Sequence, residues 1–219
     1  MRETNAPLMD IMYKAGLAAN EDYMTYEEAA AITANMIESN FDPYAGGYSS
    51  RFTTLTHFEE FQWFKGIQEI PQYCFSCCSK LTSIAISDSV TKISNGVFGG
   101  CNSLTSIVIP NSVISIGENA FGNCSSLTSI TIPDSVTSIG YYAFNGCISL
   151  SSITCLATTA PTVSSNPFGG RYSEYTGYNT YDQGINKLKV PAGATGYEES
   201  YWADPLQNSS YCGFTIEYI

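Results

Sequence analysis

The chain has 219 residues, which is enough to bury a sizeable core in one domain or two. It carries 9 Lys and Arg against 20 Asp and Glu, so its formal net charge is −11. Because nucleic-acid binding needs a cationic surface, this charge argues against a phosphate-backbone partner. Residues 71–157 hold only two basic and three acidic side chains, so hydroxyl groups and backbone must keep this middle part soluble.

No apolar run approaches the roughly 20 residues that a membrane-spanning helix requires. The first residues, MRETNAPLMDIM, lack a basic segment followed by a continuous apolar one, which is the pattern of a signal peptide. Two interpretations stay open at this point: a cytosolic protein, or a mature chain whose leader has been removed.

The first predicted element is a helix in TYEEAAAITANMIESNF. Thr25 and Glu28 have the spacing of a capping box at its start. The same stretch resembles an EF-hand-type loop that ends at Glu28. A calcium loop needs oxygen ligands at its first and third positions, which here would be Leu17 and Ala19. The capping box explains these residues without an ion, so we expect no metal here.

From Phe58 onward the chain repeats with a fixed period. One repeat unit, CNSLTSIVIPNSVISIGENAFGN at 101–123, aligns residue for residue with the next, CSSLTSITIPDSVTSIGYYAFNG at 124–146. Four columns of the repeat are Leu81, Leu104, Leu127 and Leu150; Phe75, Phe98, Phe121 and Phe144; Cys78, Cys101, Cys124 and Cys147; and Ile84, Ile107, Ile130 and Ile153. A fixed period of this length predicts a solenoid, because one unit cannot bury its apolar edge alone.

The period extends in both directions. Stepping back by one repeat unit aligns Phe58, Phe61 and Trp63 with Leu81, Ile84 and Ile86, and Ile67 and Ile70 with Val90 and Ile93. FEEFQWFKGIQEIPQYCFSC is therefore predicted to be an aromatic first coil. INKLKVP at 185–191 also matches the repeat, but a strict period would start it at position 173. We expect one extra residue before Phe168 and the others in a local insertion at residues 169–184.

Within each unit, L-x-x-I-x-I-P predicts a short strand, and identical strands stacked coil on coil give a parallel sheet. V-x-x-I predicts a second short extended piece, and G-x-x-A-F-x-x-C turns the chain back. Such an array needs a cap at each end. We assign these roles to the N-terminal helices and to residues 192–219.

The motif L-x-x-I-x-I-P-x-S-V-x-x-I-G-x-x-A-F-x-x-C resembles the leucine-rich repeat of the BspA-like family of bacterial surface proteins. The resemblance covers residues 58–157 closely and 185–191 with the following VPAG more loosely. It implies a solenoid with a curved parallel sheet, export from the cell, and adhesion to host proteins or other cells. It implies no catalytic residue.

The periodic cysteines are predicted to be buried thiols, because parallel Cβ vectors in stacked coils oppose disulfide bonds. Cys74, Cys77 and Cys78 crowd together, but zinc needs four converging Cys or His ligands and His57 is the single histidine. We therefore expect no metal and no cofactor.

Catalytic patterns are also missing, because a serine nucleophile needs a base within reach and His57 falls in the first coil. One column of the repeat is polar and contains Asp88, Asn111 and Asp134. These side chains are predicted to cap turns by hydrogen bonding to their own backbone. The alternative is that the column binds metal through its carboxylates.

Two surfaces remain for binding. The strand residues that point away from the core are small and neutral: Ser83, Ala85, Ser106, Val108, Ser129, Thr131, Ser152 and Thr154. The insertion instead carries aromatic side chains at every third residue beside a basic one: Arg171, Tyr172, Tyr175, Tyr178 and Tyr181. Tyrosine-rich loops with Ser, Gly and Asn are typical of binding surfaces. The alternative is that these tyrosines fold back over the last coil as a lid.

The sequence therefore predicts an α/β repeat fold: a leucine-rich-repeat solenoid of stacked parallel strands at 58–191, a helical cap at 1–57 and a C-terminal cap at 192–219. The predicted function is a noncatalytic binding or adhesion module, secreted or at the cell surface, for a host or bacterial surface protein or a glycan. Nucleic acid and a membrane span are not expected. The alternative function is a structural spacer with no specific ligand, and an enzyme with a site in the insertion is the least favoured.

Overall fold

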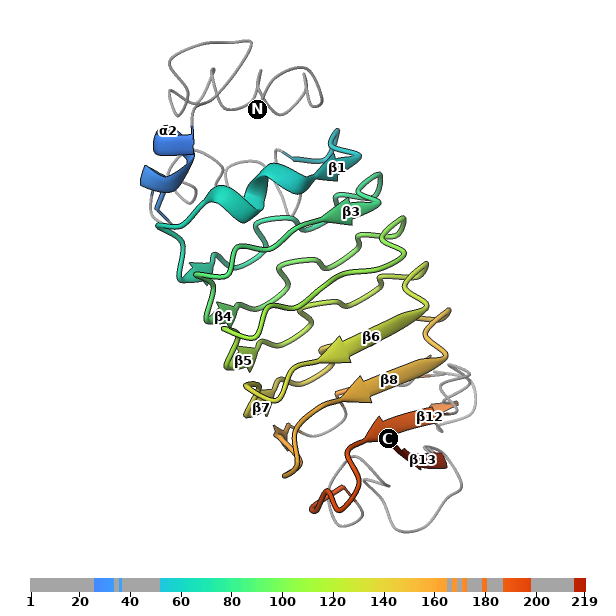
Figure 1. Cartoon of the computed structure of the whole chain (residues 1–219). Coiled ribbons are helices and arrows are strands. Elements are labelled where there is room, and N and C mark those ends of the chain that lie inside the picture. Colours follow the sequence, from blue (N-terminus) through green and yellow to red (C-terminus); the bar gives the residue numbers. More distant parts are fainter. Residues whose placement is uncertain are drawn as a thin grey trace.

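The structure is a computed structural model that describes residues 26–33, 36, 52–164, 167–168, 171–172, 179–180, 187–197 and 215–219. Within these residues the chain winds as a solenoid. Successive coils stack from the end that holds β1 to the end that holds β12 and β13 (Figure 1). Each complete coil contributes a run to a first strand column, a run to a second strand column, and a turn-back segment.

The first strand column is a parallel ladder. Its strands are β1 (His57–Phe58), β3 (Ser83–Ile84), β6 (Ser129–Ile132), β8 (Ser152–Cys155), β12 (Lys187–Val190) and β13 (Thr215–Tyr218). Parallel bridges from Ala85 to Val108 and from Val108 to Thr131 connect β3 to β6. The predicted parallel stacking at intervals of one repeat unit is confirmed.

The second strand column is a five-stranded parallel sheet. Its strands are β2 (Glu69–Ile70), β4 (Lys92–Ile93), β5 (Ser115–Ile116), β7 (Ser138–Ile139) and β9 (Thr162–Val163). Ile70 pairs with Ile93 as the repeat predicts. Ser138 pairs with Thr162, one position later than a strict repeat would give, so the extra residue expected before Phe168 lies before β9.

The turn-back segments are also linked from coil to coil by backbone hydrogen bonds. The N–H groups of Phe98 and Phe121 donate to the carbonyl groups of Ala120 and Ala143, at 2.8 and 2.7 Å. The buried phenylalanine rings behind them form one stack. Ring centroids of Phe75, Phe98, Phe121, Phe144 and Phe168 follow one another at 5.6, 5.3, 5.3 and 5.8 Å.

The core lies between these three runs and consists of the predicted columns. The periodic Leu, Ile, Val, Phe and Cys side chains are all buried. Each periodic thiol from Cys101 onward also donates to a phenylalanine carbonyl of the preceding coil, for example Cys124 Sγ to Phe98 O at 3.2 Å. Burial of the periodic cysteines is thus confirmed.

The predicted register of the first coil is wrong in part. Phe58 pairs with Ile84, three positions beyond Leu81, its predicted counterpart. The three extra residues are taken up by the 3-10 helix η1 (Glu59–Trp63). Phe61 is buried, but Trp63 is 38% exposed and does not occupy the core position of Ile86. Leu55, Phe58 and Phe61 lie three residues apart, so the Leu and Ile of L-x-x-I can be matched by Phe58 and Phe61, as predicted, or by Leu55 and Phe58, as observed.

The last predicted coil has the expected register, because Leu188 in β12 pairs with Ile153 in β8. Tyr197, in the segment after it, is buried, and its hydroxyl donates to Ala157 O at 2.9 Å. The following strand β13 adds one more parallel strand beside β12.

The predicted caps are not confirmed, since the regular elements of the described residues are mostly strands. In the N-terminal part they contain one helix, α2 (Tyr26–Ala31), with Ala29 and Ile32 in the core. Thr25, the predicted capping residue, lies outside the described residues. Both caps and the domain limits 1–57, 58–191 and 192–219 remain predictions.

Candidate functional site

A shallow groove of about 1020 Å³ crosses four successive coils beside the turn-back segments. Most of its lining comes from two adjacent columns of the repeat, Cys77, Gly100, Asn123 and Gly146 and then Ser79, Asn102, Ser125 and Ile148. Tyr142 and Asn145 complete it. The groove is therefore a product of the repeat itself and follows the solenoid axis.

The backbone at the groove adopts a left-handed turn in every coil. Cys77, Gly100, Asn123 and Gly146 have φ values of 59°, 77°, 59° and 74°. Gly adopts this region without a steric cost, and Asn does so more easily than most residues. The N–H group two positions on then donates to the carbonyl of the turn residue, as from Asn102 to Gly100 at 2.8 Å. These turns set the outward direction of the second lining column.

The groove carries no charge, since none of its lining residues is acidic or basic, and its lining combines amide and hydroxyl groups with apolar groups. Among the hydrogen bonds of the described chain, none uses the side-chain amide of Asn102, Asn123 or Asn145. By contrast, the Asn95 amide oxygen accepts from the Glu118 N–H at 2.9 Å. The groove amides are therefore available to a ligand.

One end of the groove has apolar side chains. Ile148 is 53% exposed, and the Tyr142 ring lies 3.7 Å from that of Tyr141, centroid to centroid. At the other end lies the exposed Cys77. The sequence analysis did not find this groove. The signal that could have found it is the column of Cys, Gly, Asn and Gly at 77, 100, 123 and 146, where glycine and asparagine alternate.

The predicted site residues of the insertion are only partly described. Arg171 and Tyr172 form β10 (Arg171–Tyr172), which pairs antiparallel with β11 (Asn179–Thr180). The insertion therefore contains a hairpin, with Tyr172 opposite Asn179. Tyr175, Tyr178 and Tyr181 lie outside the described residues. The choice between a binding loop and a lid stays open.

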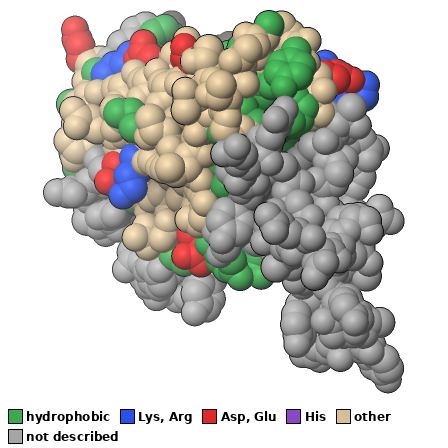
Figure 2. All heavy atoms as spheres, turned by 90° about the horizontal axis from the view of Figure 1, so that it is seen from below, with side chains coloured by type: hydrophobic (Ala, Val, Ile, Leu, Met, Phe, Trp, Pro, Cys, Tyr) green, Lys and Arg blue, Asp and Glu red, His purple; other side chains and the backbone are tan. Residues whose placement is uncertain are grey.

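On the outer face of the first strand column the predicted residues are neutral, but charge lies at one end, because Lys187 and Lys189 of β12 pair with Ser152 and Thr154 and share their face. Its side chains are exposed or half-buried, and Val108 at its centre is 78% exposed. A view of another face, along the stack, also shows mostly polar side chains and backbone with scattered charged groups (Figure 2).

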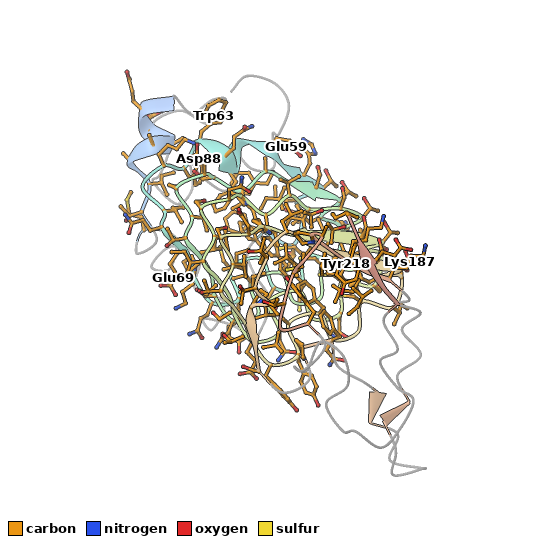
Figure 3. The ribbon with its side chains drawn as sticks, turned by 60° about the horizontal axis from the view of Figure 1, so that its bottom comes forward. Glu59, Trp63, Glu69, Asp88, Lys187 and Tyr218 are labelled. Atoms are coloured by element: carbon orange, nitrogen blue, oxygen red, sulfur yellow. The ribbon has the colours of Figure 1, made fainter. Side chains whose placement is uncertain are left out.

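Ion pairs join neighbouring coils at several places in the described chain. Lys65 pairs with Asp88 and Lys92 with Glu69, and Lys187 of β12 pairs with Glu217 of β13 at 2.7 Å. The Lys92 hydrogen bond, helped by one from Ser94, holds the pKa of Glu69 below its ordinary value. Figure 3 shows Asp88 on the side of the molecule that also holds Glu59 and Trp63 of η1. Asp88 is thus engaged with a cation from the preceding coil.

Ser83, the serine opposite the single histidine, does not form a nucleophile and base with it. His57 lies opposite Ser83 in the parallel ladder, and its Nδ1 is 3.0 Å from Thr56 Oγ1. Ser83 Oγ donates to Glu59 Oε1 at 2.6 Å. A serine nucleophile needs its hydroxyl bonded to the base and donors for an oxyanion. Ser83 instead holds η1 against β3.

The described cysteines differ in exposure. Cys77 is exposed, whereas Cys74 and Cys78 are buried, so the three side chains do not share one solvent-facing site. Burial raises the pKa of the Cys101 thiol well above its ordinary value. A hydrogen bond with Cys147 and burial together raise the pKa of the Cys124 thiol. These thiols therefore stay protonated inside the stack.

Sequence comparison identifies the family. The family model described as "BspA type Leucine rich repeat region" matches residues 48–173 in six copies, which is more than half of the chain. The chain belongs to this family of BspA-type leucine-rich repeats. No curated protein matches significantly. In the described part of the chain there is no helix with the length and hydrophobicity of a membrane span.

Solved structures with some similarity come from several bacteria. A leucine rich cell surface protein of Faecalibacterium prausnitzii is 28% identical, with a TM-score of 0.45 over 57% of this chain and 30% of that one. A leucine-rich repeat protein of Bacteroides ovatus is 27% identical, with a TM-score of 0.38 over 60% and 43%. The T. pallidum Leucine Rich Repeat protein is 23% identical, with a TM-score of 0.43 over 74% and 78%. This chain thus matches less than a third of the length of the F. prausnitzii protein.

Proposed function

We propose that the chain is a noncatalytic binding or adhesion module of a bacterial cell surface, and that it recognises a protein or glycan partner. The observation that carries this proposal is how the repeat uses its residues. The large apolar columns of the repeat form the core, and the groove that faces solvent is uncharged and lined by amide and hydroxyl groups. Membership of the BspA-type repeat family supports the surface location.

Within this function, we assign a contact surface to the insertion at residues 169–184. Its residues Arg171, Tyr172, Tyr175, Tyr178 and Tyr181 combine a cation with aromatic rings. Tyrosine provides a large contact area at low entropic cost. The hairpin of β10 and β11 supports this assignment. A segment that strand pairing already orders loses less conformational entropy when it binds a partner.

The test is a binding screen of the full chain against host matrix proteins and glycans. Changing the four insertion tyrosines to Ser should abolish capture of the partner and leave the melting temperature unchanged. A large loss of stability in that variant would instead indicate a lid over the last coil. No capture across a broad panel would favour the second candidate, a structural spacer, which the largely neutral outer sheet face also fits.

A further inference from the structure

The groove across residues 77–148 has features that specify a ligand class. Three side-chain amides, two serine hydroxyls and one tyrosine hydroxyl line it, and no lining group is charged. The amides of Asn102, Asn123 and Asn145 take no part in the hydrogen bonds of the described chain. An amide group both donates and accepts, so a row of amides suits a ligand covered with hydroxyl groups.

We propose that this groove binds an uncharged glycan chain that lies along the solenoid axis. The inference rests on the proposed binding function and names both a ligand and a site that the insertion does not include. It commits to a neutral oligosaccharide, while a protein occupant is an outcome of the test below.

The backbone beside the groove disfavours a peptide ligand. A peptide that adds a strand needs an unpaired backbone edge, whereas here the backbone groups already bond from coil to coil. The N–H groups of Cys77, Gly100 and Asn123 donate to the carbonyl groups of Gly99, Gly122 and Asn145, at 2.7, 2.7 and 2.6 Å. Recognition in the groove must therefore use side chains, as it does for a sugar.

The lack of charged side chains in the lining excludes recognition of a charged ligand through ion pairs. Binding of an anionic glycan would need Arg or Lys to offset its charge, and the chain as a whole has a net charge of −11. With neither cations nor carboxylates in the lining, the groove suits a neutral polymer.

The repeat also fits a chain of identical units. The phenylalanine rings of the same four coils are 5.6, 5.3 and 5.3 Å apart, so the groove extends about 16 Å along the axis. The free amides come from three successive turn-back segments, at three different positions of the repeat. A ligand with a similar repeat can bond to each coil in turn, so the length of the groove corresponds to a few pyranose units.

The groove ends at an aromatic ring. Tyr142 and Ile148 provide the apolar part of the lining, and an aromatic face can stack against the C–H face of a pyranose. We therefore place the end of the glycan at Tyr142 and its hydroxyl groups along the amides.

The test is calorimetric titration of the full chain with cellohexaose, xylohexaose and mannohexaose, and with glucose for comparison. At least one hexasaccharide should bind, and at least tenfold more tightly than glucose, because several coils contribute. Three substitutions occur naturally in neighbouring coils: Asn123→Gly matches Gly100, Asn145→Gly matches Gly122, and Tyr142→Asn matches Asn119. The double variant Asn123→Gly/Asn145→Gly should weaken binding at least tenfold, and Tyr142→Asn should also weaken it, with unchanged melting temperatures.

The matched control is Val108→Thr on the outer sheet face, which copies Thr131 and should leave affinity within twofold. Failure of all three hexasaccharides to bind would overturn the inference, and so would binding that the groove variants leave unchanged. If the screen captures a protein partner and the groove variants abolish its binding, the assignment of a glycan as the ligand is overturned. In each case a partner captured in the screen would leave the proposed binding function standing, so the two failures are distinguishable.

Discussion

The phenylalanine stack allows a sharp test of how the coils hold one another. Phe121 is fully buried, and its ring is stacked between those of Phe98 and Phe144, with both centroid distances at 5.3 Å. Truncating a buried Phe to Ala costs about 3–5 kcal/mol, because apolar area is lost and a cavity remains. A domain of this size has a stability of about 5–15 kcal/mol. Phe121→Ala should therefore remove a fifth or more of the free energy of unfolding.

The control is Phe121→Leu, which keeps most of the buried volume and loses the two ring contacts. Aromatic pairs contribute about 0.5–1.5 kcal/mol each beyond the area that they bury, so this variant should lose about 1–3 kcal/mol. Urea unfolding followed by far-UV circular dichroism and by the fluorescence of the two tryptophans, Trp63 and Trp202, gives both values. A Phe121→Ala loss below about 1 kcal/mol, or a Leu variant as unstable as the Ala variant, would refute the reasoning.

Single contacts give three further predictions. Ser135 Oγ donates to Val113 O at 2.8 Å, whereas Ser112 Oγ, its counterpart one coil earlier, is buried and has no partner in the described structure. Ser135→Ala should therefore cost about 1 kcal/mol in urea unfolding, and Ser112→Ala should be neutral or stabilising; equal losses would contradict this. Among the described cysteines, alkylation of the native protein at about pH 8 followed by peptide mass mapping should label Cys77 first, and Cys101 and Cys124 only after unfolding, because their pKa values are raised by burial. Labelling of Cys101 at the rate of Cys77 would show that the stack opens locally. The hydrogen bond from Lys92 lowers the pKa of Glu69 in the folded state, so its contribution is full above the ordinary pKa of 4.5 and is lost as the pH falls through the lower folded value. Glu69→Gln should remove this part of the acid destabilisation in pH-dependent thermal melts, and an unchanged pH profile would show that the pair is screened by solvent.

The regular coils could be predicted from sequence because their signal is redundant. Leucine, isoleucine, phenylalanine and cysteine columns all have the same period, and a shift of one residue would turn every strand side chain to the wrong face. The late arrival of Leu188 was also predictable, since INKLKVP retains the apolar alternation after the insertion. The register of the first coil was not predictable. Phe58 and Phe61 are three residues apart, and the observed register differs from the predicted one by three residues as well.

The groove was missed for another physical reason. Sequence patterns detect what is buried, since burial restricts residue type, whereas Asn102, Asn123 and Ser125 are not buried. What restricts the groove is the backbone, because positions 77, 100, 123 and 146 must have positive φ. Cys77 and Asn123 adopt the same backbone conformation as Gly100 and Gly146. Because these four residues differ in type, the sequence does not reveal that they share a backbone constraint. The insertion at residues 169–184 was predicted by counting and remains a prediction, because most of its residues lie outside those that the structure describes.

The left-handed turns in successive coils have a consequence for how this chain could change in length. Because the turn falls at the same position of every repeat unit, deletion or duplication of one whole unit would keep the backbone conformation of the turns on either side. Each such event would change the groove by one step of about 5.3 Å. The number of coils then sets how long a ligand can lie in the groove, and the side chains of each coil set the chemistry of that step.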